Sequence, residues 1–367
     1  MKISVQRNQL LAPLQVAHAV VERRQTLPIL ANVLVTASTE GFRMSATDLE
    51  VELSVPGELE ACVTAGSTTL PARKLLDLCR AMPDDTVLTL EVSGERAAVR
   101  AGRSRFSLAT LPAAEFPGID VKGDAFEIEL PQRDLRRAIE ATHFAMAQQD
   151  VRYYLNGMLL EINGGRVRLV ATDGHRMAVT DLALTVSSEL SRRIIVPRKT
   201  VIEALRLLAD EDTPARLAVG DDHLTLAAAD VVFKSKVIDG SFPDYERVIP
   251  RNQDKVVDID RLTLRDALGR VAIFANEKYR SVRVQLEPNL LRLSANNAEN
   301  EEGEDELEVA YGGSTLEIGF NVSYLIDVLT ALRSDKVRLH LSDAGSSCLI
   351  TEPEGGAHRY VIMPMRL

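Results

Sequence analysis

The run Asp173-Gly174-His175-Arg176 has the residue types and spacing most suited to chemistry in this chain. A carboxylate beside a histidine is a common general-base arrangement, so one interpretation is the acid–base site of a hydrolase. The surrounding pattern occurs twice more, and there the matching residues are Asp48-Leu49-Glu50 and Asn297-Ala298-Glu299. No nucleophile motif or metal-ligand spacing accompanies them. We therefore expect no catalytic residue, no metal, no cofactor, and a protein that is not an enzyme.

Basic side chains suggest a different chemistry, contact with phosphate groups. They recur on helical patterns throughout the chain, away from the apolar stripes: Arg73, Lys74, Arg133, Arg136, Arg137, Arg198, Lys199, Arg261, Arg265, Arg270, Arg333 and Lys336. Each alone is ordinary for the solvent face of a helix, but their recurrence favours a sequence-independent contact with duplex DNA that permits sliding. Because the net charge is −10, the distribution of charge matters more than its sum. With no Trp and 4% aromatic residues, a stacking platform for single strands is disfavoured.

Charges of opposite sign gather near the two ends of the chain. The acidic stretch 299–308 contains Glu299, Glu301, Glu302, Glu304, Asp305, Glu306 and Glu308. It has two interpretations, a solvated loop, which is the commoner case, or an interaction surface. The basic segment contains Arg96, Arg100, Arg103 and Arg105, with Lys74 nearby in sequence, and 103–108 alternates polar and apolar residues as an edge strand would. Such opposite ends would make a head-to-tail contact, the type that closes into rings.

The elements that must position these residues come in three copies. A helical pattern with apolar residues at i, i+3, i+4 and i+7 recurs after 126 and then 124 residues. Its members are Leu75, Leu78, Cys79 and Met82, then Val201, Ala204, Leu205 and Leu208, then Leu325, Val328, Leu329 and Leu332. A second helical stripe lies upstream in each copy: Leu10, Leu14, Ala17 and Val21, then Leu135, Ile139, Thr142 and Met146, then Leu264, Leu268, Val271 and Ala275. A spacing this long is that of a whole domain.

Between the helices, β-branched alternating runs predict strands at 29–35, 154–162 and 282–286. A second strand follows each and ends at Asp48, Asp173 or Asn297, and every copy closes on a proline, Pro117, Pro243 or Pro364. We predict an α+β fold: three tandem copies of one domain, each with two helices on antiparallel sheets. The predicted domains are 1–122, 126–252 and 254–367, each of the usual size for an independent core.

Composition and geometry bound the setting and the assembly. No apolar run approaches a membrane span, the start is typical of a strand leading into a helix, and Cys62, Cys79 and Cys348 form no CxxC pair, so we expect a cytoplasmic protein without a signal peptide.

Three domains of about 35 Å in a ring leave a hole of only about 5 Å, whereas six leave about 35 Å. Duplex DNA is about 20 Å across, so two chains could encircle it and one could not. A monomeric multidomain scaffold without DNA remains the alternative.

Four runs then make the sequence recognisable: Arg152-Tyr153-Tyr154-Leu155-Asn156-Gly157, Ala171-Thr172-Asp173-Gly174-His175-Arg176, Phe242-Pro243-Asp244-Tyr245 and Met363-Pro364-Met365-Arg366-Leu367. They resemble the bacterial sliding clamps, the beta subunit of DNA polymerase III, and the resemblance covers all three repeats in order. It implies a homodimeric ring of six domains, the DNA clamp fold, that tethers the replicative polymerase as a processivity factor without catalysis. It also implies an ATP-driven loader, and the chain has no G-x-x-x-x-G-K-[ST] loop of its own to power ring opening.

The resemblance also implies particular contact residues. Contacts to the DNA backbone fall on Arg24, Arg73, Gln149, Tyr153 and Tyr154, although half-buried packing is an alternative role for the two tyrosines. A hydrophobic cleft for short peptides of the polymerase III catalytic subunit, the clamp loader, other polymerases and repair proteins maps to Leu155, Thr172, Gly174, His175, Arg176, Met177, Pro243, Arg247, Val248, Asn321, Tyr324, Val361, Met363, Pro364, Met365 and Arg366. Met177 and Tyr279 stand where the wider family often has Leu and Phe, which affects the choice of peptide.

The dimer seam is expected to join the two charged ends. Phe106 is predicted to pack against Ile273 and Phe274 of the second copy of the chain. The flanking charges are Lys74, Arg96, Arg103 and Arg105 on one side and Glu301, Glu302 and Glu304 on the other.

Overall fold

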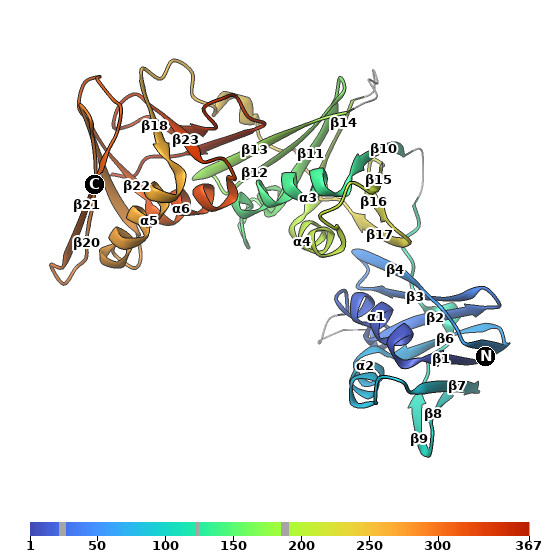
Figure 1. The fold of residues 1–367 in the computed structure, drawn as a ribbon. Helices are drawn as coiled ribbons and strands as arrows, with labels where there is room; N and C mark the ends of the chain where they lie inside the picture. Colours follow the sequence, from blue (N-terminus) through green and yellow to red (C-terminus); the bar gives the residue numbers. More distant parts are fainter. Residues whose placement is uncertain (22–26, 122–124, 185–190, 367) are drawn as a thin grey trace. The chain divides into compact units, whose positions relative to one another are not determined.

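A computed structural model describes residues 1–21, 27–121, 125–184 and 191–366 (Figure 1). The first copy comprises β1 (Lys2–Gln6), α1 (Arg7–His18), η1 (Pro28–Ala31), β2 (Asn32–Ser38), β3 (Gly41–Thr47), β4 (Val51–Gly57), β5 (Ala61–Thr64), β6 (Gly66–Pro71), α2 (Ala72–Ala81), β7 (Val87–Ser93), β8 (Arg96–Ala101), β9 (Ser104–Ala109) and η2 (Ala113–Glu115).

The second copy repeats this order with one strand fewer. It comprises β10 (Phe126–Pro131), α3 (Gln132–Glu140), η3 (His143–Ala145), η4 (Tyr153–Asn156), β11 (Gly157–Asn163), β12 (Arg166–Thr172), β13 (Arg176–Ala183), β14 (Arg192–Pro197), α4 (Arg198–Leu207), β15 (Pro214–Val219), β16 (His223–Ala228), β17 (Val231–Lys236) and η5 (Tyr245–Arg247).

The third copy has the same arrangement. It comprises β18 (Lys255–Asp260), α5 (Arg261–Val271), η6 (Ala272–Phe274), β19 (Ser281–Glu287), β20 (Leu290–Asn296), β21 (Glu302–Glu308), β22 (Leu316–Asn321), α6 (Val322–Ala331), β23 (Lys336–Leu341), β24 (Cys348–Thr351) and β25 (His358–Ile362). Each copy therefore has two α-helices and antiparallel strands, which confirms the α+β fold in three tandem copies.

The strands of each copy form two half-sheets. The first half-sheet holds the opening strand and the last three strands of the copy, in the orders β1-β7-β8-β9, β10-β15-β16-β17 and β18-β23-β24-β25, with β5 added beside β1 in the first copy. The second half-sheet holds the remaining strands, in the orders β6-β2-β3-β4, β14-β11-β12-β13 and β22-β19-β20-β21. Every pairing between neighbouring strands is antiparallel, as the sequence predicts.

Consecutive copies are joined by continuous hydrogen bonding between half-sheets. The second half-sheet of copy one pairs through β4 with β17 of copy two, and that of copy two pairs through β13 with β25 of copy three. Each joint makes one eight-stranded sheet. The chain accordingly divides into two compact units, 1–133 with 206–237 and 134–205 with 238–367, so the second copy is shared between them. Strands β9 and β21 end the two smaller sheets.

Helices lie on these sheets with the predicted stripes inward. Leu10, Leu14 and Ala17 of α1 are buried against β3 and β4, and Leu264, Leu268 and Val271 of α5 are buried against β20 and β21. A side-chain cap begins α5, where Asp260 Oδ1 accepts from the Thr263 amide at 2.8 Å. The described part of the chain has no helix long and apolar enough to cross a membrane.

Several predicted boundaries are wrong by part of a helical turn or more. Helices α1, α3 and α5 end before the last residue of each predicted stripe, because a 3₁₀ turn or a loop follows. Thr142 and Met146 nevertheless stay buried after α3, where the Thr142 hydroxyl donates to the Ala138 carbonyl at 2.8 Å. The strands expected from residues 29 and 154 begin later, at Asn32 and Gly157, because the 3₁₀ turns η1 and η4 precede them.

Candidate functional site

The run 173–176 forms a tight turn between β12 and β13. Asp173 Oδ1 accepts hydrogen bonds from the amides of His175 and Arg176 at 2.9 and 3.0 Å. Gly174 has φ = +87°, a conformation that favours glycine, and a Cβ there would lie 3.0 Å from the Arg152 guanidinium. The Asp173 carboxylate closes the turn, so the hydrolase interpretation loses its general base.

Arg176 fixes one wall of the predicted peptide cleft. Its guanidinium pairs with Asp327 of α6, donates to the Phe144 carbonyl at 2.9 Å and lies 4.4 Å from the centre of the Tyr324 ring. These contacts join the β12–β13 turn to the third copy. Because Arg176 is mostly buried and its donors are engaged, its role is to hold Tyr324 and α6 in place rather than to offer a free charge.

The predicted cleft residues all lie within one compact unit, on η4, β12, the β12–β13 turn, β13, the segment 241–248, β22, α6, β25 and the tail 363–366. Met177 lies opposite Val361 in the β13–β25 pairing, and both belong to a buried cluster with Leu159, Phe242 and Tyr245. This cluster forms an apolar floor. Six of the predicted cleft residues are exposed: Pro243, Arg247, Val248, Met363, His175 and Arg366. The carboxyl-terminal segment is anchored by amides of Met363 and Met365, which donate to the carbonyls of His175 and Gly319.

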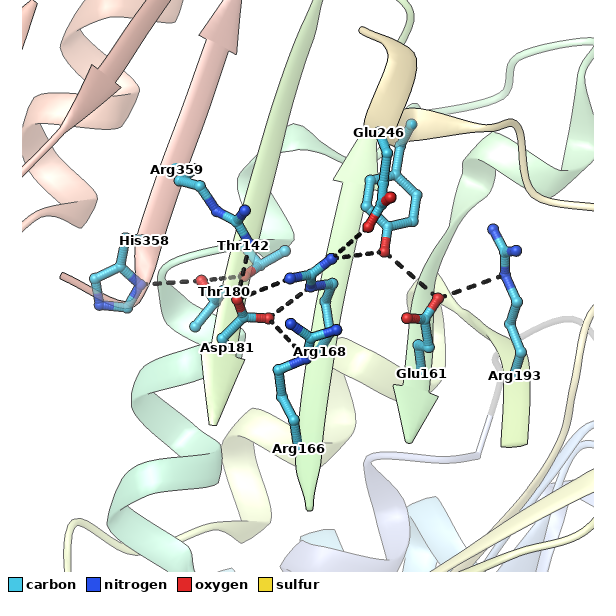
Figure 2. A network of polar contacts seen from close by, with 11 residues as sticks. Thr142, Glu161, Arg166, Arg168, Thr180, Asp181, Arg193, Glu246, His358 and Arg359 are labelled. Atoms are coloured by element: carbon cyan, nitrogen blue, oxygen red, sulfur yellow. Dashed lines mark hydrogen bonds and ion pairs between the residues drawn. The ribbon is translucent and has the colours of Figure 1, made fainter. Parts of the chain in front are cut away.

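A polar network lies beside this floor (Figure 2). The buried Arg168 of β12 donates from Nε and Nη2 to both carboxylate oxygens of Asp181, at 2.6 and 3.0 Å. Its Nη1 donates to the Tyr245 hydroxyl at 3.1 Å and to Glu246 at 3.0 Å. Burial alone would raise the pKa of Asp181, but Arg168, Arg359 and Arg166 outweigh it and lower that pKa. The hydrogen bond to Asp181 raises the pKa of Arg168, so both partners stay charged. Sequence reasoning did not identify this network.

Among the predicted DNA contacts, Arg24 lies outside the described residues. Arg73 is exposed on α2 and pairs with Asp77 at 3.1 Å. Gln149 and Tyr153 are exposed on the connection before β11, whereas Tyr154 packs on the buried cluster. Half-buried packing is therefore the role of Tyr154 that the structure supports.

The same connection carries Arg152, which sequence reasoning also missed. Arg152 donates to both oxygens of Asp150, at 3.0 and 2.9 Å, and to the Asp173 carbonyl. The hydrogen bonds from Arg152 lower the pKa of Asp150 to about 2. This pairing ties the connection to the β12–β13 turn.

Many of the basic helix residues already have acidic partners. Arg133 pairs with Asp210 and Asp212, Arg136 with Glu140, Arg265 with Asp266 and Arg270 with Asp305. A phosphate at these positions would compete with a carboxylate. The basic helix residues would therefore attract DNA less strongly than a count of Arg and Lys suggests.

Strand β9, the predicted edge strand, ends the first half-sheet of copy one, and Phe106 on it is 36% exposed. Within each last hairpin, Phe106 lies opposite Val99, Phe233 opposite Leu226, and Tyr360 opposite Ile350. The three aromatic residues therefore hold the same place in the repeat. Phe233 and Tyr360 are 1% and 0% exposed because they lie at the joints with β4 and β13. Phe106 thus holds in copy one the position that Phe233 and Tyr360 hold at the joints in copies two and three.

The acidic stretch forms a strand from Glu302 to Glu308, so the loop interpretation is wrong there. This strand, β21, ends the second half-sheet of copy three. The Phe274 ring lies against Gly303, where a Cβ would come within 2.3 Å of it, and Ile273 beside it is 76% exposed. Arg292 of β20 pairs with Glu304 and Glu306 at 3.4 and 2.8 Å, a partner that sequence reasoning missed. Lys74 is exposed on α2. The other predicted seam residues lie along the edge strand of each small sheet or close to it in the chain.

Comparison with known proteins agrees with this geometry. The chain matches the three domain families of the DNA polymerase III beta subunit, the N-terminal domain over residues 1–120, the central domain over 129–244 and the C-terminal domain over 246–366. The chain belongs to the DNA polymerase III beta subunit family, the bacterial sliding clamps.

Individual relatives cover the whole chain. The beta sliding clamps of Pseudomonas aeruginosa and Escherichia coli K12 are 49% and 47% identical to it over 367 residues, all of each protein. A crystal structure of the Pseudomonas aeruginosa clamp with ligand superposes with a TM-score of 0.97 over all of both chains. The clamp from Bartonella birtlesii bound to griselimycin is 36% identical, with a TM-score of 0.94 and full coverage of both chains.

Proposed function

We propose that two copies of this chain close head to tail into a ring of six clamp domains around duplex DNA. The ring serves as a processivity factor, a sliding tether for the replicative polymerase. The observation that carries this proposal is the repeat of the joints. Within the chain, β4 pairs with β17 and β13 with β25. By position in the repeat, the pairing still to be made is β21 with β9, which needs a second chain. The proposed clamp domains are 1–122, 126–252 and 254–367.

The joints also supply a register for this seam. Phe233 lies opposite Leu53, and Tyr360 opposite Ala178. On the neighbouring strand of the same sheet, Leu53 lies opposite Ala46, and Ala178 lies opposite Ala171. Ala295 holds the same place in copy three, and its partner on β21 is Gly303. Gly303 is therefore the residue of β21 that matches Leu53 and Ala178. Phe106 of one chain should therefore lie over Gly303 of the other, against Phe274. The same register sets Arg105 opposite Glu304, and Arg103 opposite Glu306.

The charges of this seam follow a pattern already present inside the chain. At the first joint, Lys234 of β17 lies 3.6 Å from Glu52 of β4. At the second, Arg359 of β25 lies 2.7 Å from Asp181 of β13. In each case the base comes from the last strand of a first half-sheet and the acid from a second half-sheet. Strands β9 and β21 have this same polarity, which favours head-to-tail closure over contact between like edges.

The ring would hold duplex DNA without recognising its base sequence. A ring of six such domains leaves an opening of about 35 Å, and duplex DNA is about 20 Å across. We propose that Arg24, Arg73, Gln149, Tyr153 and Tyr154 contact its backbone. Because Tyr154 is half-buried, its contribution should be smaller than that of the exposed Tyr153. Contacts of this kind are independent of base sequence and sensitive to salt.

The predicted cleft is the proposed docking surface for partner proteins. Relatives of known structure bind griselimycin, among them the clamps of Pseudomonas aeruginosa and Bartonella birtlesii. We propose that this chain binds short peptides of the polymerase III catalytic subunit, the clamp loader and other polymerases and repair proteins at the same kind of surface. An apolar floor with a few fixed polar groups suits such anchors. The proposed location is the cytoplasm.

The test is retention on DNA of different topology. The protein is loaded onto nicked circular plasmid with a bacterial clamp loader and ATP, and bound protein is separated by gel filtration before and after one restriction cut. We expect retention on the circle and loss after linearisation, because a ring slides off a free end. A reaction without loader controls for direct binding. Equal retention on both forms would mean ordinary surface binding and would overturn the ring.

A further inference from the structure

The segment 241–248 would form one wall of the proposed peptide surface, and it pairs with no strand among the residues that the structure describes. It enters the buried cluster through the rings of Phe242 and Tyr245. Between and beyond these anchors it presents Pro243, Arg247 and Val248 as exposed side chains. The conformation of this segment therefore depends on these two rings and on the polar contacts that Tyr245 and Glu246 make with the sheet.

Those contacts converge on Arg168. The Tyr245 hydroxyl accepts from Arg168 Nη1 at 3.1 Å and donates to Glu161 at 3.4 Å, and Glu246 accepts from the same Nη1 at 3.0 Å. Figure 2 shows the Arg168 guanidinium lying between the Asp181 carboxylate and Glu246. The Arg168 side chain is 5% exposed, so water offers little replacement for these bonds.

The same guanidinium is tied to the strands that supply the floor of the peptide surface. Asp181 lies on β13, the strand that carries Met177, and it also accepts from Arg359 of β25 at 2.7 Å. Strand β25 carries Val361, two residues beyond Arg359. Arg168 itself lies on β12, the strand that ends at Thr172. The planar guanidinium of Arg168 thus joins the segment 241–248 to the strands that supply the floor.

We propose that Arg168 and Tyr245 are positioning residues for ligand binding at the peptide surface. The hydrogen bond between them sets the place of Pro243 and Val248 relative to Met177 and Val361, without touching the ligand. This inference rests on the proposed peptide-binding function. It adds a determinant of affinity that lies behind the surface rather than on it.

The sharpest variant is Tyr245→Phe, which keeps the ring in the cluster and removes only the hydroxyl. Labelled griselimycin serves as the probe, and its affinity is measured by fluorescence anisotropy on the full-length protein. We expect the dissociation constant to rise about threefold to tenfold, the equivalent of about one net hydrogen bond. Hydrogen exchange of the Val248 amide, which donates to the Tyr245 carbonyl, should accelerate in parallel.

Tyr311→Phe is the matched control. Tyr311 is another buried tyrosine of the same compact unit, and its hydroxyl donates to the Ser314 carbonyl at 2.7 Å, away from the predicted cleft residues. It should lower the melting temperature about as much as Tyr245→Phe while leaving griselimycin affinity unchanged. A second variant, Arg168→Lys, keeps the charge but loses the fork. Adding Tyr245→Phe to it should weaken binding no further, because the shared hydrogen bond is already lost.

The outcomes separate the inference from the function on which it rests. If the unaltered protein does not bind griselimycin, the proposed peptide surface fails. If it binds and Tyr245→Phe binds equally well, only the positioning role fails. Equal losses of affinity in Tyr245→Phe and Tyr311→Phe would likewise overturn it, because they would reflect general destabilisation.

Discussion

Phe106 is an aromatic residue at a position that is buried elsewhere in the chain. Its counterparts Phe233 and Tyr360 are covered by a neighbouring strand, while Phe106 is 36% exposed. Replacing a buried Phe by Ala typically costs about 3–5 kcal/mol. We therefore expect Phe106→Ala to raise the dimer dissociation constant at least about 100-fold, measured by sedimentation equilibrium.

Val63→Ala provides the control for this variant. Val63 is an exposed apolar residue on β5, at the opposite edge of the sheet that ends in β9. It should leave the dissociation constant unchanged, since no seam is proposed at that edge. If Phe106→Ala has the same dimer dissociation constant as the unaltered protein, Phe106 is not part of the seam.

Individual residues also mark what the sequence could predict. Met177 and Val361 were assigned to one cleft, and they do lie opposite each other in the β13–β25 pairing. The partner of Arg176, Asp327, is 151 residues away in sequence. The three side-chain partners of Arg168, namely Asp181, Tyr245 and Glu246, lie on two other elements, β13 and η5. Side-chain networks of this kind depend on tertiary placement, which local periodicity does not encode.

At the scale of elements, the proposed seam is a pairing of β9 with β21 in one register. The proposed register sets Arg105 of one chain opposite Glu304 of the other, a pair close enough for a disulfide if both become Cys. In a Cys62→Ser background, Arg105→Cys with Glu304→Cys should form a cross-linked dimer under mild oxidation, measured on a non-reducing gel. Ser107→Cys with Glu304→Cys is the control, displaced by two residues, and should cross-link far less. Preferential cross-linking of the displaced pair would show a different register.

The element scale shows both the reach and the limit of sequence patterns. The alternation at 103–108 correctly predicted an edge strand, because the period of two survives in a half-exposed strand. The stretch 302–308 alternates too, with Gly303, Asp305 and Leu307 less exposed than their neighbours. Its charges have low strand propensity and hid that period, and pairing with β20 overrides the propensity.

For the whole molecule, head-to-tail closure makes the two ends of the chain complementary to each other and not to themselves. A variant with Arg103→Glu and Arg105→Glu has two acidic edges, and a variant with Glu304→Arg and Glu306→Arg has two basic edges. Each alone should remain monomeric, because like charges directly opposed across a seam cost several kcal/mol. Mixed in equal amounts they should form a heterodimer, since both seams then pair opposite charges.

Native mass spectrometry distinguishes the species, and retention on nicked circular DNA reports whether the mixed dimer is a closed ring. The mixture also controls for folding, because restored seams require that β9 and β21 are intact in both variants. Arg292 makes this check necessary, since it pairs with Glu304 and Glu306 within one chain and would face like charge in the second variant. An isologous contact between like edges already sets like charges opposite each other in the unaltered protein, so under that arrangement each variant alone would dimerise about as well as the unaltered protein. Loss of the dimer in each variant alone, followed by rescue on mixing, would therefore establish the polarity that lets three domains per chain close into a ring of six.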